Sequence, residues 1–195
     1  MRSITEDILQ WSEHYLEPKN EHLGNVPVCP YARLARLRKT YGIIECHKNS
    51  EFLDKIIEGI EQIKNPDKQI IIVACDDVEW EVEELNAVVH TLNVLHVPQD
   101  IYLMCAHPYD DEEDEPVEFL DTKEWQPDNE FMMVLIQNFD ELEKASDNLQ
   151  KTGYYQHWPS DYYEGTVKKR QSYRRYRNDK TIKTTPGGKK GQGLT

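Results

Sequence analysis

The 195-residue sequence lacks any apolar stretch that approaches the roughly 20 residues needed to cross a bilayer. Its first residues, Met1 to Asp7, contain no hydrophobic region of the kind found in signal peptides. We therefore expect a cytoplasmic protein that does not associate with membranes. The chain has only 4 cysteines, and in a reducing compartment these favour free thiols, a metal site or catalysis over a disulfide framework.

The sequence also lacks motifs that would indicate a particular reaction. The sequence contains no closely spaced Cys-x-x-Cys pair and no His-Glu-x-x-His pattern, which are typical of zinc sites. It shows neither an internal repeat nor a heptad array. No sequence motif therefore assigns a reaction, and candidate residues have to be found from the fold that the chain predicts.

Charge is divided unevenly along the chain. The formal net charge is −13, yet residues 165–195 carry +9 and residues 1–164 carry −22. This pattern indicates an acidic body followed by a basic arm. Such an arm can reach nucleic acid, an acidic protein, or the acidic body of the same chain.

The N-terminal part predicts two helices. Apolar residues from Ile4 to Leu16 follow helical spacing, and Pro18 should end that helix. Pro30 suits the first position of a second helix because its missing N–H would be unsatisfied there anyway. This placement makes Cys29 the predicted N-cap.

The middle of the chain alternates between strand and helix patterns. The predicted strands are 42–46, 70–74, 101–104 and 131–136, and amphipathic helices are predicted near 52–63, 78–95 and 140–149. The 70–74 strand is almost wholly apolar, as expected of a strand in the middle of a sheet. Two consecutive strand-helix-strand units predict an α/β fold with a four-stranded, mainly parallel sheet flanked by helices. The alternative is a mixed sheet, in an antiparallel ferredoxin-like arrangement with an added helix.

These elements define the expected domains. Residues 1–153 are predicted to form a single α/β domain with an N-terminal helical segment. Residues 154–195 form an aromatic and basic C-terminal extension, and the part from Thr184 onward is predicted to be disordered.

Cysteine, histidine and aspartate side chains follow the predicted strands at their downstream ends. Cys46 and His47 follow the first strand, Cys75 and Asp76 the second, and Cys105 and His107 the third. If these strands are parallel, the side chains gather along one edge of the sheet, where open α/β sheets bind ligands. The sequence thus predicts a functional crevice at that edge.

Cys29 is a candidate reactive thiol. A thiol at a helix N-terminus faces the positive end of the helix dipole, and Arg33 and Arg36 follow one and two turns later. Both effects favour the thiolate, which acts as a nucleophile or a soft metal ligand. The alternative is that Cys29 is a small buried hydrophobic residue, since free cysteine is among the most buried residue types.

The same strand-end residues are competent metal ligands. Thiolate sulfur and imidazole nitrogen from Cys46, His47, Cys105 and His107, together with Cys29, would suit zinc or iron. Asp76 could act with His107 as acid and base, with Cys29 and His107 as the main catalytic groups. The alternative is that the cysteines belong to the core, that the histidines are hydrogen-bonded or solvated, and that Asp76 or Asp77 caps a helix.

Two short motifs resemble those of an uncharacterised bacterial family of unknown function. Members of that family carry a Cys-Pro-Phe-Ala motif after an N-terminal helix and a Phe-His-Pro motif after a later strand. The matching residues are Cys29-Pro30-Tyr31-Ala32 and Ala106-His107-Pro108, in the same order and at a similar separation. The resemblance spans about Ile4 to Leu149 and implies an α/β fold with Cys29 and His107 as candidate site residues, without a reaction.

The C-terminal extension is rich in aromatic residues and then in basic ones. Tyrosines and Trp158 come first, followed by the basic residues Lys168, Lys169, Arg170, Arg174, Arg175 and Arg177. Stacking rings interleaved with cations are typical of single-stranded nucleic-acid binding. The alternative is that the rings fix the segment to the body while its cations neutralise acidic groups, within one chain or across a homo-oligomer.

Two classes of function remain open from the sequence. In the first, the protein is a small enzyme or metal-binding protein that uses Cys29 and His107 at the strand-end crevice. In the second, it is a non-catalytic accessory protein whose basic extension binds an acidic protein or nucleic acid.

Overall fold

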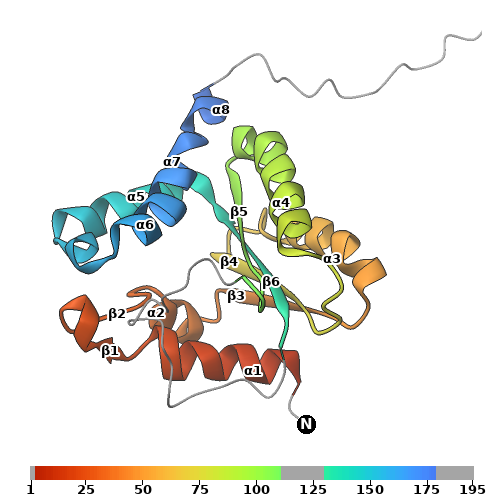
Figure 1. The fold of residues 1–195 in the computed structure, drawn as a ribbon, viewed down its shortest axis with the longest axis horizontal. Coiled ribbons are helices and arrows are strands. Elements are labelled where there is room, and N and C mark those ends of the chain that lie inside the picture. Colours follow the sequence, from red (N-terminus) through yellow and green to blue (C-terminus); the bar gives the residue numbers. More distant parts are fainter. Residues whose placement is uncertain (1–2, 111–129, 179–195) are drawn as a thin grey trace, which may run out of the picture.

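The computed structural model describes residues 3–110 and 130–178 (Figure 1). Its α-helices are α1 (Ile4–Trp11), α2 (Ala32–Leu37), α3 (Asn49–Gln62), α4 (Val82–His96), α5 (Phe139–Lys151), α6 (Ser160–Tyr163), α7 (Lys169–Ser172) and α8 (Arg174–Asn178). Short π- or 3-10 helical segments cover Ser12–Leu16, Glu21–Leu23, Val97–Gln99, Tyr154–His157 and Glu164–Lys168. The strands are β1 (Lys19–Asn20), β2 (Val26–Pro27), β3 (Tyr41–Cys46), β4 (Ile70–Cys75), β5 (Ile101–Ala106) and β6 (Met132–Asn138).

The main sheet has four strands in the order β3-β4-β6-β5. β3 and β4 are parallel, whereas β6 is antiparallel to both of its neighbours, β4 and β5. β3, β4 and β5 therefore run in one direction and β6 runs against them. The α/β class and the helices flanking the sheet are confirmed, and the apolar strand β4 lies inside the sheet as predicted.

The prediction of a mainly parallel sheet is wrong. Parallel neighbours need a long crossover, normally a helix, whereas antiparallel neighbours do not. The helix α4 carries the chain from β4 to β5, and β5 leaves the neighbouring position beside β4 empty. β6 then fills that position in the opposite direction, so each of its pairings is antiparallel. The sequence between β5 and β6 is polar and shows no amphipathic helix pattern.

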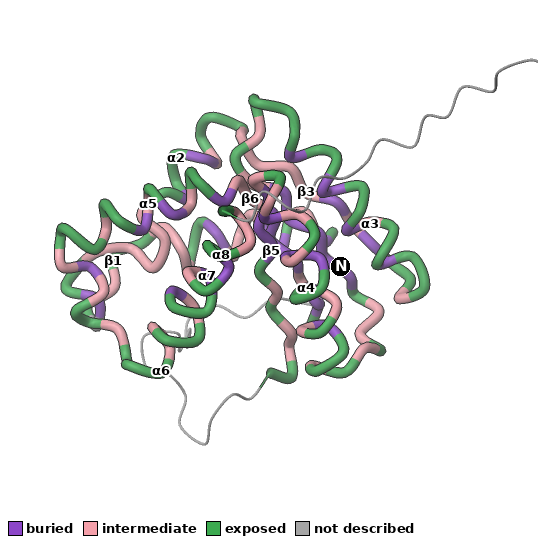
Figure 2. The backbone as a smooth tube through the Cα atoms, turned by 90° about the horizontal axis from the view of Figure 1, so that it is seen from above, coloured by how far each residue is buried: buried purple, intermediate pink, exposed green. Residues whose placement is uncertain are grey.

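One face of the sheet packs against α3 and α4 and forms the largest core cluster. Phe52, Ile56 and Ile60 of α3 and Ile63 at its C-cap are buried there, as their helical spacing predicts. Gly59 lets α3 approach the sheet closely, because a Cβ at this position would lie 2.7 Å from Cδ1 of Ile136. Figure 2 shows that the buried residues concentrate on the strands and on the inner sides of these helices.

The opposite face of the sheet is covered from two directions. α1 places Ile4 and Ile8 against β4 and β6. The C-terminal helices cover the other end, where Tyr173 packs on Tyr102 of β5 and on Phe139. In Figure 1, α1 lies below the sheet, and α5 to α8 lie to its upper left.

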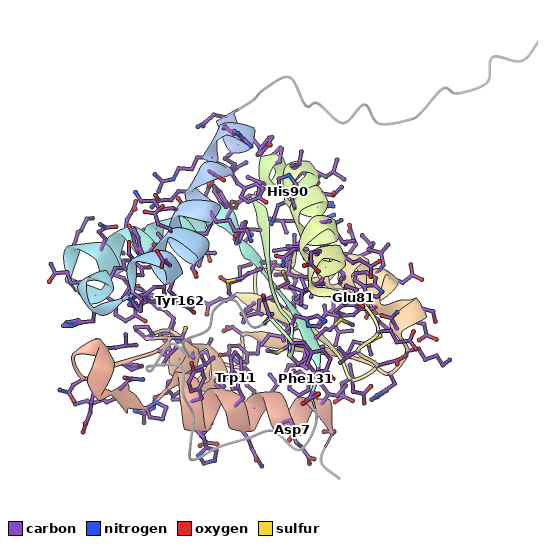
Figure 3. All side chains as sticks on the ribbon, viewed as in Figure 1. Asp7, Trp11, Glu81, His90, Phe131 and Tyr162 are labelled. Atoms are coloured by element: carbon purple, nitrogen blue, oxygen red, sulfur yellow. The ribbon has the colours of Figure 1, made fainter. Side chains whose placement is uncertain are left out.

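Residues 154–178 contact both ends of the body. The hydroxyl of Tyr173 lies 2.6 Å from Nδ1 of His90 on α4, whose position is labelled in Figure 3. At the other end, the hydroxyl of Tyr154 donates a hydrogen bond to the backbone oxygen of Val28. The part of the extension that the structure describes therefore lies against the body, while the segment predicted to be disordered, from Thr184 onward, lies outside the described residues.

Candidate functional site

The register of β3 and β4 brings the first two strand-end groups together. Cys46 pairs with Cys75, so the next residues along the two parallel strands, His47 and Asp76, lie beside each other. Nδ1 of His47 is 3.0 Å from Oδ2 of Asp76 and 3.2 Å from Oδ1. Because a carboxylate only accepts hydrogen bonds, Nδ1 carries the proton and Nε2 is the nitrogen left to exchange protons with solvent.

A second carboxylate flanks the same imidazole. Oε2 of Glu45 lies 3.6 Å from Nε2 of His47, while Oε1 of Glu45 accepts a hydrogen bond of 2.9 Å from the backbone N–H of Thr5. The Thr5 hydrogen bond lowers the pKa of Glu45 below its usual value. The side chain of His47 remains 63% exposed, so a substrate can reach it.

The pKa of His47 is raised above its ordinary value, mainly by the hydrogen bond to Asp76 and also by the negative charge of that carboxylate. The folded protein therefore binds this proton more tightly than the unfolded chain does. The resulting stabilisation is fully present below the unfolded pKa of about 6.5 and is lost as the pH rises through the higher folded value. At a given pH, the imidazolium form of His47 is therefore more populated than that of an ordinary histidine.

The two cysteines beneath this pair are buried thiols. Cys46 Sγ donates to the backbone oxygen of Lys48 at 3.2 Å, and Cys75 Sγ donates to that of Asp77 at 3.6 Å. Burial raises the pKa of Cys75 to about 12. At neutral pH this side chain stays a thiol, which is neither a nucleophile nor a ready metal ligand.

Helix capping is the alternative role that the sequence leaves open for Asp76 or Asp77. Asp77 does cap a helix, but this helix is α3, which precedes Asp77 in the chain, and not α4, which follows it. Its Oδ2 accepts a 2.8 Å hydrogen bond from the backbone N–H of Asn49, at the first position of α3. α4 begins only at Val82, with Glu81 at its N-cap. Asp77 therefore fixes the start of α3 beside the His47–Asp76 pair.

His107 does not join the pair. Its Nδ1 accepts a 3.1 Å hydrogen bond from the backbone N–H of Tyr109, so Nε2 carries the proton and donates to the backbone oxygen of Trp80 at 2.9 Å. Both ring nitrogens are thus used by backbone groups. This corrects the prediction that His107 is a base for Asp76 or a metal ligand, because neither nitrogen offers a lone pair.

The environment of Cys29 differs from the one that the sequence predicts. It is not an N-cap, since α2 begins at Ala32 with Tyr31 at its N-cap. Burial raises the pKa of the Cys29 thiol, and this effect outweighs the backbone N–H groups of Tyr31 and Ala32, which act in the opposite direction. Arg36 binds Glu17 through two hydrogen bonds of 2.6 and 2.8 Å instead of supporting a thiolate. The N-cap position predicted for Cys29 is therefore wrong, and the raised pKa runs against the thiolate that the prediction expected.

The proposed metal ligands are not assembled. Within residues 3–110 and 130–178, no group of three or more His, Cys, Asp or Glu side chains is arranged to hold a metal ion. Cys105 is half-buried on the core face, with Sγ 3.6 Å from Oδ1 of Asn86. Cys46, His47, Cys105 and His107 therefore occupy three separate environments, and the donor set does not fit one zinc or iron ion.

Part of the basic extension is occupied by the body's own acidic groups. Glu143 of α5 binds both Arg170, at 2.6 Å, and Arg174. Arg177 binds Asp140 at 2.7 Å. Neutralisation within one chain, an alternative left open by the sequence, is thus observed for these three arginines.

The remaining predicted cations, Lys168, Lys169 and Arg175, are exposed. Lys168 lies over the ring of Tyr163, 5.8 Å from its centre, and Arg175 lies over that of Tyr176 at 4.7 Å. Lys169 instead lies 3.5 Å from Oδ1 of Asn86. These three side chains are available to a partner, although each also has a contact within the chain.

Comparisons with known proteins found no match among protein-family models, curated proteins or solved structures. In the part of the chain that the structure describes, no helix is both long enough and apolar enough to cross a membrane. The candidate site therefore depends on its geometry alone.

Proposed function

We propose that the protein is a small hydrolytic enzyme in which His47 transfers the proton and Asp76 orients the imidazole. The observation that carries this proposal is the 3.0 Å contact between Nδ1 of His47 and Asp76 at the carboxyl ends of two paired parallel strands. A carboxylate that holds Nδ1–H leaves Nε2 as the basic nitrogen. The exposure of this imidazole lets water and substrate reach it.

The chemistry that fits this pair is water-dependent cleavage of an ester or amide. Nε2 of neutral His47 accepts a proton from a water molecule as the water oxygen attacks the carbonyl carbon. The resulting imidazolium then gives that proton to the leaving oxygen or nitrogen as the acyl bond breaks. Asp76 acts as a positioning residue that stabilises the charged intermediate form of the imidazole.

Charge around the pair selects the substrate class. Glu45 and Asp76 flank His47, and Asp77 and Glu79 lie nearby through their contacts with Asn49. These carboxylates repel anions such as phosphate esters and attract cations. A neutral or cationic ester or amide is therefore the substrate class that the site favours.

A panel of chromogenic substrates tests the proposal. Wild-type protein should hydrolyse neutral esters or cationic aminoacyl anilides and leave phosphate monoesters intact. His47→Gln should reduce kcat/KM by about 100-fold or more, the usual contribution of general acid–base catalysis. His14→Gln is the matched control, because His14 is an exposed histidine in the Ser12–Leu16 segment. Equal activity of the wild-type and His47→Gln proteins would contradict the proposal.

The alternative is a non-catalytic accessory protein that binds an acidic protein or nucleic acid. Its support is the exposure of Lys168, Lys169 and Arg175, of which Lys168 and Arg175 lie over aromatic rings. The ion pairs of Arg170, Arg174 and Arg177 weigh against it, since half of the predicted contact residues already have acidic partners. An inactive wild-type protein that binds an oligonucleotide in a salt-dependent manner would favour this alternative.

A further inference from the structure

The short helix α2 exposes apolar side chains on its outer face. Ala32 and Ala35 point inward, with exposed fractions of 2% and 7%. Tyr31, Leu34 and Leu37 are 44%, 46% and 63% exposed, and their spacing of three residues places them along one side of the helix. A row of large exposed apolar residues is a common mark of an interaction surface.

Basic side chains surround this apolar row. Arg33, Arg38 and Lys39 are exposed, and among the ion pairs of the described residues none involves these three. Arg36, which points toward Glu13 and Glu17, is the basic residue of α2 that is already paired. We call Tyr31, Arg33, Leu34, Leu37, Arg38 and Lys39 the α2 surface. It is a locally positive, partly apolar surface on a protein of net charge −13.

α3 carries a surface of opposite charge and similar apolar content. Leu53 and Ile57 are 43% and 41% exposed, although the helix buries its other apolar stripe. Asp54, Glu58 and Glu61 are exposed on the same side of the helix at spacings of three and four residues. Lys55 pairs with Glu58 and Lys64 with Glu61, whereas Asp54 is in no ion pair recorded between described residues. We call Leu53, Asp54, Ile57, Glu58 and Glu61 the α3 surface.

We propose that the α2 surface of one molecule binds the α3 surface of a second copy of the same chain. Leu34 and Leu37 would pack against Leu53 and Ile57, while the α2 cations face the α3 carboxylates. The two surfaces lie on different sides of the molecule (Figures 1 and 2). The contact is therefore head-to-tail, and each added copy leaves one free surface of each kind.

The small size of the two surfaces points to a weak association. Two short helix faces bury less than the roughly 1,200 Å² that stable complexes start from. We expect a dissociation constant on the order of 100 μM and reversible oligomers that grow with concentration. Since charge attraction contributes, salt well above about 0.15 M should weaken the association.

Sedimentation of the full chain between about 10 and 500 μM, a range chosen around that dissociation constant, tests the proposal. The expected result is a weight-average mass that rises with concentration for the wild-type protein. Leu34→Glu/Leu37→Glu should abolish the rise, and so should Leu53→Lys/Ile57→Lys. Leu95→Glu is the matched control, because Leu95 is 52% exposed on α4 and belongs to neither surface. Circular dichroism checks that each variant remains folded.

Mixing the two broken variants identifies the head-to-tail contact. The α2 variant keeps an intact α3 surface, and the α3 variant keeps an intact α2 surface. Their mixture should form a 1:1 dimer that does not grow further, whereas each variant alone stays monomeric. A monomeric wild-type protein throughout the concentration range, equal weakening by Leu95→Glu, or no dimer in the mixture would each overturn the proposal.

Discussion

Replacement of Glu143 by alanine is expected to reduce the free energy of unfolding by about 3–5 kcal/mol, the usual cost of breaking a buried ion pair from one side. Glu143 is 8% exposed and Arg170 is 5% exposed, and their Nε to Oε1 distance is 2.6 Å. Nη2 of Arg170 is buried and already lacks a hydrogen-bond partner in the described structure. Without Glu143, the whole guanidinium is left as an uncompensated buried charge.

Urea denaturation of three variants measures this effect. Arg174→Ala is the matched control, because Arg174 binds the same carboxylate but is 48% exposed, and an exposed pair is worth about 1 kcal/mol or less. The double variant Glu143→Leu/Arg170→Met should recover much of the loss, since it removes both buried charges. A loss below about 1 kcal/mol for Glu143→Ala would show that the pair is not buried in solution.

Replacement of Asn93 by alanine is expected to cost about 2–5 kcal/mol, because two buried backbone groups lose their hydrogen bonds. Asn93 of α4 is 2% exposed. Its Oδ1 accepts from the backbone N–H of Leu103 at 2.7 Å, and its Nδ2 donates to the oxygen of Leu103 at 2.8 Å. β5 is an edge strand, and Leu103 directs these two groups away from β6. Asn93 thus takes the place of a further strand.

Chemical denaturation and light scattering test this role of Asn93. The variant should unfold at lower denaturant and aggregate more readily, since an unpaired edge strand can pair with another chain. Thr91→Ala is the control on the same helix. The Thr91 side chain is exposed, and within the described residues its hydroxyl donates only to the Ala87 oxygen of its own helix. A loss of less than about 1 kcal/mol for Asn93→Ala would mean that water replaces both hydrogen bonds.

Local patterns predict the elements of this fold better than their directions. The stripe of α3 indicates its helix because burial on one side leaves a 3.6-residue period, and the continuous apolar run of β4 indicates a strand buried on both faces. The direction of β6 depends on its place between β4 and β5 in the sheet, and no local periodicity in the sequence encodes that place. Even within α3, Leu53 and Ile57 match the apolar pattern but lie outside the core.

Part of the candidate site can be predicted from the sequence, namely the part that depends on where neighbouring strands end. A shared register of β3 and β4 places His47 beside Asp76, so the expected gathering at one edge holds for this pair. The environment of His107 is set by backbone groups of Trp80 and Tyr109. That of Cys29 is affected by the pairing of Arg36 with Glu17. Neither contact can be read from the local sequence. Glu45 was missed, although it shares a strand face with His47 at a spacing of two residues.

The most direct test of His47 as an oriented proton-transfer group is an NMR titration of its ring signals in the wild-type protein and in Asp76→Asn. The wild-type pKa should lie above the ordinary value of 6.5, because Asp76 stabilises the imidazolium. Asp76→Asn removes that charge while keeping the shape of the side chain, and should bring the pKa of His47 back toward its ordinary value. Equal pKa values in the two proteins would contradict the account, because the 3.0 Å contact would then have no effect on the proton that the site is proposed to transfer.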